Sequence, residues 1–366
     1  MKPYFTRILP IKALQRIYPS RFFQLENCSL SELWNADKET EHMLPSPESK
    51  LGNLIHKLID QVVRGTIKDL VGFENKFDEE LEGIEYLWFE KHLIPLRRNI
   101  PDFEVKRQHC LNRVKEILNE KRVTSPVGEG KFRRRNGSNV WLESQDLLIG
   151  GYIDEINQFG PVLRIIDYKS GSVYDRDKNQ LKAEYTTQLK LYAALYYDNF
   201  QTWPDELIIK QVDGNEIRVP FSQDECLALF QQAKNKFYYI NQLISKNTDA
   251  SKLATPSPAN CKYCTYRPVC NFYHQNMEDI STEWAKVDLY GTLLEREALG
   301  NGKERILLQA KNKYYYIRGV SSRHPALNER SLTNIRIYNL SRDTKSNHFM
   351  ENNTTTIYID NPQVNR

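Results

Sequence analysis

The first third of the chain carries hydrophobic residues at helical spacing. Pro19 and Ser20 precede RFFQLENCSLSELW, which predicts a helix that begins near residue 20 and contains Cys28. The run LGNLIHKLIDQVV places five apolar side chains on one stripe, beside His56: Leu51, Leu54, Ile55, Leu58 and Ile59. A third run, FEVKRQHCLNRVKEILNE, has the same period. These patterns predict a helical N-terminal region.

The pattern changes after Pro126 to short alternating segments. Three of them, VWLES, DLLIGGYIDEI and VLRIIDYKSG, predict strands. The segment YTTQLKLYAALYY returns to helical spacing, and DELIIKQVDGNEIRVPF predicts a hairpin that turns at Asp213 and Gly214. A long helix is expected over residues 222–246. Helices and strands mixed in this order predict an α/β fold.

The chain becomes strand-rich again from about Asp288. The segments are YGTLLERE, ERILLQA, KYYYIRGV, TNIRIYNL and TTTIYI. Five strands without a clear intervening helix predict a small all-β module, for which an oligonucleotide-binding barrel is the natural form. The alternative is that these strands extend the main sheet. We expect an α/β domain over residues 1–283 and a β-rich domain over residues 284–366.

Composition excludes several classes of protein. Hydrophobic residues make up 40% and charged residues 27% of the 366 positions, which excludes a disordered or low-complexity chain. No segment reaches the ~18 apolar residues that span a membrane. Arg7, Pro10 and Lys12 interrupt the first residues, where a signal peptide would be apolar. We therefore expect a cytoplasmic protein.

Basic residues gather ahead of the first predicted strand. The net charge of +4 is too small to identify a nucleic-acid partner. Residues 106–135, however, hold ten Lys or Arg and three Asp or Glu. The end of this segment predicts phosphate contacts from Lys131, Arg133, Arg134 and Arg135, and a solvated charged loop explains it equally well.

Two carboxylates and an ammonium are expected at one edge of the predicted sheet. Asp154 lies near the end of one strand, and Asp167 and Lys169 lie at the end of the next, on one face because they are two residues apart. Carboxylates this close favour a hard divalent cation such as Mg²⁺ or Mn²⁺, and a lysine beside it can orient or deprotonate water. By itself the D-x-K pattern is more often an ordinary ion pair. Glu143 either contributes to this site or is a surface residue.

Together with neighbouring motifs, this set resembles the RecB-type branch of the PD-(D/E)XK nucleases. The matching segments are GNLIH, GYID, DYKSG and QLKLY, with Ser170 where threonine is frequent. The resemblance implies a restriction-endonuclease-like core. It also implies metal ligands at His56, Asp154, Asp167 and the carbonyl of Tyr168, and catalytic roles for Lys169, Gln188 and Tyr192.

Four of the six cysteines extend the resemblance. Cys261, Cys264 and Cys270 form C-x2-C-x5-C, and Cys28 lies far upstream. This set is similar to the iron–sulfur subset of the family, which includes the AddB nuclease domain and the RecB-like CRISPR-associated exonucleases, and it implies a [4Fe–4S] cluster. From spacing alone a four-cysteine zinc site is at least as probable. Cys110 and Cys226 have no partner spacing and are interpreted as ordinary thiols.

The resemblance implies a metal-dependent DNA nuclease. Iron–sulfur members mostly trim single-stranded ends, so we expect a single-strand exonuclease in repair, recombination or defence. The sequence contains no phosphate-binding loop of the G-x-x-x-x-G-K-[ST] type, so a helicase partner would supply strand opening. One alternative is a DNA-end-binding or assembly subunit that uses the fold as a non-catalytic clamp. Another is a zinc-stapled RNA-binding protein.

Overall fold

A computed structural model describes most of the chain. The described residues are 9–36, 42–88, 90–123, 137–169, 171–175, 180–211, 214–246, 249–277, 281, 284–328 and 333–359. They fall into two compact units. The central unit comprises Ala13–Glu26 and Pro47–Thr248, and the terminal unit comprises Met1–Lys12, Asn27–Ser46 and Asp249–Arg366. Among the described residues, no helix is long and apolar enough to cross a membrane.

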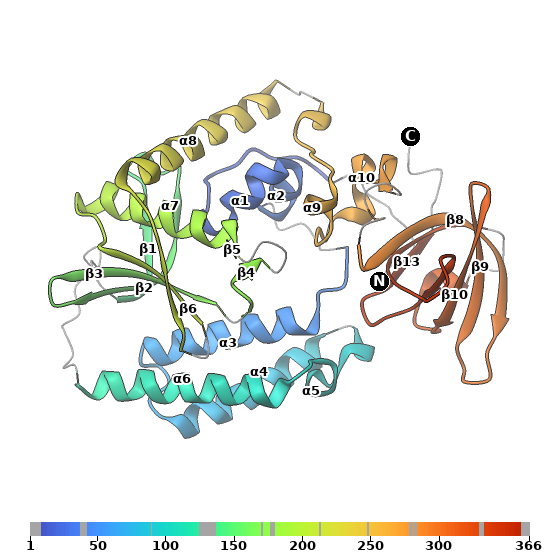
Figure 1. Ribbon diagram of the computed structural model, residues 1–366, viewed down its shortest axis with the longest axis horizontal. Helices are drawn as coiled ribbons and strands as arrows, with labels where there is room; N and C mark the ends of the chain where they lie inside the picture. The colour runs from blue at the N-terminus through green and yellow to red at the C-terminus, as the bar shows by residue number, and fades with distance from the viewer. Residues whose placement is uncertain are drawn as a thin grey trace. The chain divides into compact units, whose positions relative to one another are not determined.

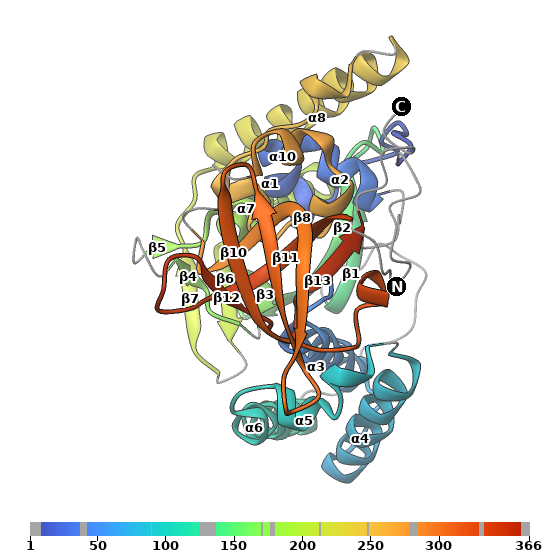
Figure 2. The same cartoon turned by 90° about the vertical axis from the view of Figure 1, so that its right-hand side faces the viewer.

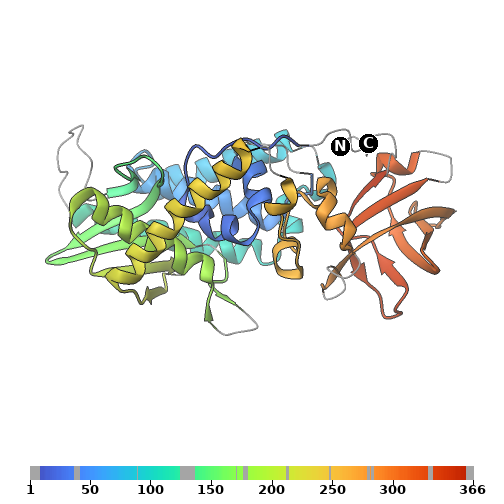
Figure 3. The same ribbon diagram turned by 90° about the horizontal axis from the view of Figure 1, so that it is seen from above.

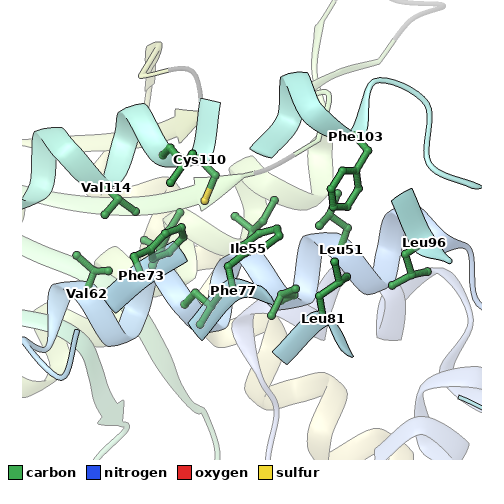
Figure 4. Close-up of a cluster of buried hydrophobic side chains, with 14 of the residues drawn as sticks. Leu51, Ile55, Val62, Phe73, Phe77, Leu81, Leu96, Phe103, Cys110 and Val114 are labelled. Carbon is green, nitrogen blue, oxygen red and sulfur yellow. The ribbon is translucent and has the colours of Figure 1, made fainter. Parts of the chain in front are cut away.

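A hydrophobic core holds the helices of the central unit together. Helix α3 buries one face, as its apolar spacing predicts, and packs against α4 and α6 (Figure 4). Asp69 caps α4 by accepting a hydrogen bond from the Gly72 N–H at 2.7 Å. The helices of this part are α1 (Pro19–Asn27), α3 (Pro47–Val63), α4 (Leu70–Leu87), η1 (Lys91–Leu93), α5 (Leu96–Asn99) and α6 (Phe103–Val123).

The central sheet has five strands in the order β1-β2-β3-β6-β7. Its pairs are antiparallel except for β3 and β6, which are parallel and are connected through helix α7. Helix α7 packs on β1, β2, β3 and β6 and also contacts α8 (Figure 1). The bounds are β1 (Gly137–Glu143), β2 (Gly150–Phe159), β3 (Val162–Lys169), β4 (Tyr174–Asp175), β5 (Gln180–Leu181), α7 (Ala183–Phe200), β6 (Glu206–Gln211), β7 (Glu216–Val219) and α8 (Gln223–Ser245). This mixed sheet with covering helices agrees with the predicted restriction-endonuclease-like core.

The terminal unit contains a separate six-stranded sheet of order β12-β10-β9-β8-β11-β13 (Figure 2). Strand β12 pairs with β10 in parallel and with β11 antiparallel, so strands β8 to β12 form a closed sheet. Figure 3 shows these strands, in orange and red, from above. Their bounds are β8 (Lys286–Ala298), β9 (Glu304–Ala310), β10 (Lys313–Val320), η4 (Pro325–Asn328), β11 (Asn334–Arg342), β12 (His348–Met350) and β13 (Thr356–Ile359). The alternative that these strands extend the main sheet is wrong.

Short helices complete the terminal unit. They are α2 (Ser29–Ala36), η2 (Ala250–Lys252), α9 (Pro258–Cys261), η3 (Arg267–Val269) and α10 (Asn271–Gln275). The boundary that the sequence predicts at residue 283 falls inside this unit.

The structure corrects two sequence predictions. The helix expected through Cys28 is interrupted there, because the N–H of Leu30 donates to the carbonyl of Leu253 at 2.8 Å instead of continuing the helical ladder. The strand β12 was not predicted, because its three residues carry too little pattern. The other predicted helices and strands named above are present.

Candidate active site and cysteine-lined pocket

The two predicted acidic ligands meet where β2 and β3 stop pairing. Beyond the paired Glu155 and Ile166, the Oδ2 atom of Asp154 accepts a hydrogen bond from the N–H of Tyr168 at 2.8 Å. This contact places Asp154 next to Asp167, whose side chain is almost completely buried. The two carboxylates therefore lie side by side on adjacent strands of the central sheet, although a hairpin separates them in the sequence.

Lys169 and Gln188 complete a closed set of contacts around Asp167. The Nζ atom of Lys169 lies 2.7 Å from Asp167 Oδ2 and 3.3 Å from Gln188 Oε1. The amide of Gln188 donates to Asp167 Oδ1 at 2.8 Å. Gln188 lies on α7 and the other two residues lie on β3, so packing of the helix on the sheet builds this triangle.

Tyr185 is a neighbour of this triangle that the sequence analysis did not single out. Its ring centroid lies 4.8 Å from the Lys169 ammonium, which is the distance of a cation–π contact. Tyr185 precedes Gln188 by three residues on the same helix, and this spacing was the available signal.

Helix α3 brings His56 into the electrostatic surroundings of the triangle. Burial lowers the pKa of His56, and the charge of Lys169 lowers it further, while Asp167 opposes the change. The imidazole is therefore neutral at pH 7, which is the form that binds metals. Asp60 lies one turn later on α3, and its charge raises the pKa of Asp154. Asp60 also forms an ion pair with Arg64 at 2.8 Å. The sequence analysis missed Asp60, and its i,i+4 spacing from His56 was the signal.

Tyr192 supports β2 and also lies within hydrogen-bonding reach of Gln188 in the triangle. Its hydroxyl donates to the carbonyl of Tyr152 at 2.8 Å, two residues before Asp154. A Cβ atom at Gly151 would lie 3.2 Å from the Tyr192 ring and 3.1 Å from Pro19, so a glycine permits this close approach. Burial raises the pKa of Tyr192, so the phenol stays protonated and can donate this bond.

The side chain of Tyr168 belongs to a different network from that of Asp167. Its hydroxyl accepts a hydrogen bond from Arg113 at 3.0 Å and donates one to Glu155. Arg113 is itself buried and pairs with Glu116 at 2.9 Å. Alternation along β3 thus directs Tyr168 away from the triangle, as the sequence predicts, and only its backbone remains beside Asp154.

Burial and like charge act strongly on Asp154. Burial is the larger cause and the charge of Asp167 is the second, and together they raise the pKa of Asp154 to about 7. The hydrogen bond from the Tyr168 N–H and the charge of Lys169 oppose this increase. Burial lowers the pKa of Lys169, but the two carboxylates outweigh it and the net pKa lies above the usual value. Lys169 is therefore a cation at neutral pH.

The oxygen atoms of Asp154 and Asp167 and the neutral imidazole of His56 are chemically suitable ligands for a hard divalent cation. Within the described ranges, no three His, Cys, Asp or Glu side chains are arranged as ligands of one metal ion. The Lys169 ammonium instead balances the charge of Asp167. The donor chemistry fits Mg²⁺ or Mn²⁺, and burial together with the charge of Asp167 raises the pKa of Asp154.

Four cysteines line one pocket in the terminal unit. They are Cys28, Cys261, Cys264 and Cys270, and Trp34, Arg267 and Tyr273 also line it. Burial raises the pKa of Cys264 and Cys270 to about 12, with a further contribution from Cys28. All are free thiols. Cys110 and Cys226 lie in the central unit, on α6 and α8, and are completely buried.

Arg267 ties the cysteine segment to the C-terminal strands. This buried side chain lies 2.9 Å from Asp288 on β8, and it donates to the carbonyl of Cys261 at 2.7 Å. It also donates to Asn339 on β11 at 2.7 Å. Tyr273 donates to the same Asp288 at 2.6 Å. The loop that carries three cysteines is therefore held by two strands of the second sheet.

The remaining predicted site residues are four basic residues and Glu143. Lys131, Arg133, Arg134 and Arg135 lie outside the described residues. Glu143 pairs with Arg16 at 3.0 Å, and its backbone carbonyl accepts a bond from Asn199. Glu143 is thus part of a surface ion pair.

Comparisons with known proteins add a family assignment. The family model described as "PD-(D/E)XK nuclease superfamily" matches residues 17–271. Among solved structures, one described as "Crystal structure of SSO0001" is similar at 12% identity and a TM-score of 0.28, over 72% of this chain and 89% of that chain. A comparison with curated proteins found no match. The family match spans more than half of the chain and includes the Asp154, Asp167 and Lys169 segments. The chain belongs to the PD-(D/E)XK nuclease superfamily.

Proposed function

We propose that this protein is a metal-dependent deoxyribonuclease of the RecB type that trims single-stranded ends. Family membership implies a nuclease, and the contacts among Asp154, Asp167, Lys169 and Gln188 are the observation that supports activity of this chain.

Four groups would hold Mg²⁺ or Mn²⁺ in the active protein. They are the imidazole of His56, the carboxylates of Asp154 and Asp167, and the carbonyl of Tyr168. The ion, when bound, would supply an acidified water and a counter-charge for the phosphate. Binding of the ion would favour the charged form of Asp154. Without the ion, burial favours the protonated form.

Lys169 would orient the attacking water and stabilise negative charge on the phosphate. Its raised pKa favours this role over that of a general base, because the ammonium keeps its proton at neutral pH. Gln188 would fix the position of Lys169 through Oε1 and of Asp167 through Nε2. Tyr192 would act as a positioning residue through the backbone of β2.

The four cysteines of the pocket would hold a [4Fe–4S] cluster. All four line one pocket, and thiolates are the ligands that such clusters use. The same ligands also suit zinc, so the identity of the metal needs a measurement. Broad visible absorbance of an anaerobic preparation, together with iron content, distinguishes the two.

The closed C-terminal sheet would be an oligonucleotide-binding barrel. Its strands pair in the order of that fold, with the third strand parallel to the fifth and the fifth beside the fourth. Such a module suits an enzyme that acts on single strands in repair, recombination or defence, and a helicase would supply the single strand.

The activity test uses a labelled single strand with Mn²⁺. We expect cleavage by the wild type and a loss of at least about 100-fold in Lys169→Ala. Lys190→Ala is the matched control, because Lys190 is also an ion-paired lysine, 17% exposed against 18% for Lys169. It should cleave like the wild type.

The same test separates the alternatives. Full cleavage by Lys169→Ala would overturn the assignment of the site. A wild type that binds DNA ends in Mn²⁺ or Mg²⁺ and cleaves nothing would favour the non-catalytic clamp.

A further inference from the structure

Two consecutive residues of β2 hold Tyr168 at its opposite ends. Asp154 accepts a hydrogen bond from the Tyr168 N–H at 2.8 Å, and Glu155 accepts one from the Tyr168 hydroxyl. Among the described residues, the backbone ladder between β2 and β3 ends at the pair of Glu155 and Ile166. Side chains therefore join the end of β3 to β2 where the ladder stops.

Arg113 on α6 holds the phenol of Tyr168 from the other side. Its guanidinium donates to the Tyr168 hydroxyl at 3.0 Å and lies 5.4 Å from the centroid of the ring. The same guanidinium pairs with Glu116 at 2.9 Å, which fixes its place on the helix. The hydroxyl thus accepts from a cation and donates to a carboxylate. Charge-assisted hydrogen bonds of this kind are strong, so they define the position of the phenol.

Burial makes this contact an expensive way to pack a helix on a sheet. Arg113 and Tyr168 are both buried. Apolar side chains of similar size would join α6 to β3 without the desolvation of a guanidinium. Ile166 and Ile208, which pack with Tyr168, show that apolar contacts are used beside it. The polar contact is therefore better explained by a need for a fixed position than by a need for stability.

Tyr168 lies between two residues of the candidate active site. Asp167 and Lys169 lie 2.7 Å apart on one face of β3, and the phenol lies on the other. Because side chains alternate along a strand, bonds that fix the phenol also fix its two neighbours on the opposite face. When Asp154 serves as a metal ligand, its carboxylate is shared between the ion and the Tyr168 N–H. The bond from the hydroxyl to β2 then becomes the more important tie.

We propose that Arg113 and Glu155 are positioning residues of the metal site, which act by holding the phenol of Tyr168. They fix the end of β3 relative to β2, and thereby the carboxylate of Asp167 and the carbonyl of Tyr168 relative to Asp154. The inference rests on the proposed function, because it takes these three groups as metal ligands. Arg113 and Glu155 act through Tyr168 and need not touch the ion or the substrate.

The test measures the Mn²⁺ affinity of the full chain without nucleic acid, from the electron paramagnetic resonance signal of the free ion. Groups that orient metal ligands typically contribute about 10- to 100-fold to affinity, so Tyr168→Phe and Arg113→Met should each weaken Mn²⁺ binding at least about tenfold. Tyr168→Phe removes only the hydroxyl. Glu155→Gln keeps an acceptor for that hydroxyl, so it should bind Mn²⁺ more tightly than Glu155→Ala does.

Val114→Ala separates a loss of position from a loss of stability. Val114 follows Arg113 on α6 and is completely buried in the core of the helices. This variant should lower the melting temperature, because it leaves a cavity, and should bind Mn²⁺ like the wild type. Binding is measured well below the melting temperature of every variant, so that each protein is folded.

Cleavage of the labelled single strand gives a second readout that a merely structural role would not move. A weakened metal site fills at a higher Mn²⁺ concentration, so excess Mn²⁺ should restore cleavage by Tyr168→Phe. It should not restore cleavage by Lys169→Ala, which lacks a group that acts on the phosphate.

The outcomes separate this inference from the proposed function. Mn²⁺ affinities of Tyr168→Phe and Arg113→Met equal to that of the wild type, with cleavage intact, would refute only this inference, and so would an equal loss of affinity in Val114→Ala. A wild type that binds Mn²⁺ more tightly than the two variants but cleaves nothing would refute only the proposed function. A wild type that does not bind Mn²⁺ would refute both.

Discussion

At the scale of single residues, the burial of Asp154 beside Asp167 carries an electrostatic cost in the metal-free protein. Burial and Asp167 raise its pKa from about 3.8 to about 7. In the unfolded chain this carboxyl is charged above pH 4, while in the folded chain it keeps its proton up to about pH 7. The folded state therefore loses stability as the pH rises from 4 to 7, and the loss is complete above pH 7.

Asp154→Asn should remove this cost. The amide oxygen can still accept the bond from the Tyr168 N–H, and no charge has to be buried. In EDTA we expect the variant to exceed the wild type in unfolding free energy at pH 8, by up to about 4 kcal/mol, and to match it near pH 4. Urea denaturation at both pH values provides the measurement. A variant that is equally destabilised at both would contradict the assigned electrostatics.

The same variant should lose cleavage with Mn²⁺, because a neutral amide binds hard cations more weakly than a carboxylate. A variant that is more stable but inactive is expected when a residue serves catalysis at a cost to the stability of the fold.

At the scale of elements, the interruption between α1 and α2 places Cys28 in the cysteine-lined pocket. Ser31 donates to the Cys28 carbonyl at 3.0 Å, and Leu30 donates to Leu253, so two local bonds hold the chain at this point. A continuous helix through residue 28 would lack the bond from Leu30 to Leu253. The predicted cluster thus depends on a local departure from helical structure.

Cys28→Ala should therefore lower iron content and melting temperature more than Cys110→Ala does. Cys110 is completely buried in the hydrophobic core around α3, α4 and α6, so its loss should leave a small cavity costing ~1 kcal/mol (Figure 4). Loss of Cys28 should instead release the metal and its binding energy. Iron analysis and thermal melts of the two anaerobic preparations check this. Equal iron and equal melting temperatures would exclude Cys28 as a ligand.

At the scale of the whole molecule, the cysteine segment depends on the C-terminal sheet within one unit. Asp288 accepts from Tyr273 and pairs with Arg267, and the hydroxyl of Tyr358 on β13 donates to the carbonyl of His42 at 2.7 Å. These contacts cross the boundary that the sequence predicts at residue 283. They join the cysteine-bearing segments to the barrel rather than leaving the barrel as an appendage.

A chain that ends at residue 280 should consequently lose iron and aggregate. The truncation leaves Arg267 without its ion-pair partner, and removing one partner of a buried pair costs about 3–5 kcal/mol. Asp288→Asn in the full chain should lower the melting temperature and the iron content, but by less than the truncation does. Glu297→Gln, which removes an exposed ion pair with Arg305, is the control and should change neither. A soluble truncated chain with full iron content would establish residues 1–283 as an independent domain.

Local pattern by itself determined much of this protein. The apolar spacing of α3 predicts which of its side chains are buried, because it depends on residues a few positions apart. Alternation along β3 predicts the face of each side chain but not its burial, since residues 165–168 are all buried. The same alternation places Asp167 and Lys169 on one face and Tyr168 on the other. The acidic, lysine and glutamine motifs resemble those of the PD-(D/E)XK nucleases, and the family match confirms the superfamily.

Only the tertiary structure decided the features that depend on distant partners. The three residues of β12 become a strand because the edges of β10 and β11 are both available to them, and this closes the barrel. The break at Cys28 depends on Leu253, and the burial of Arg267 depends on Asp288 and Asn339. Hydrogen bonds and ion pairs between residues far apart in sequence leave no periodic signal, so no pattern along the chain could have predicted them.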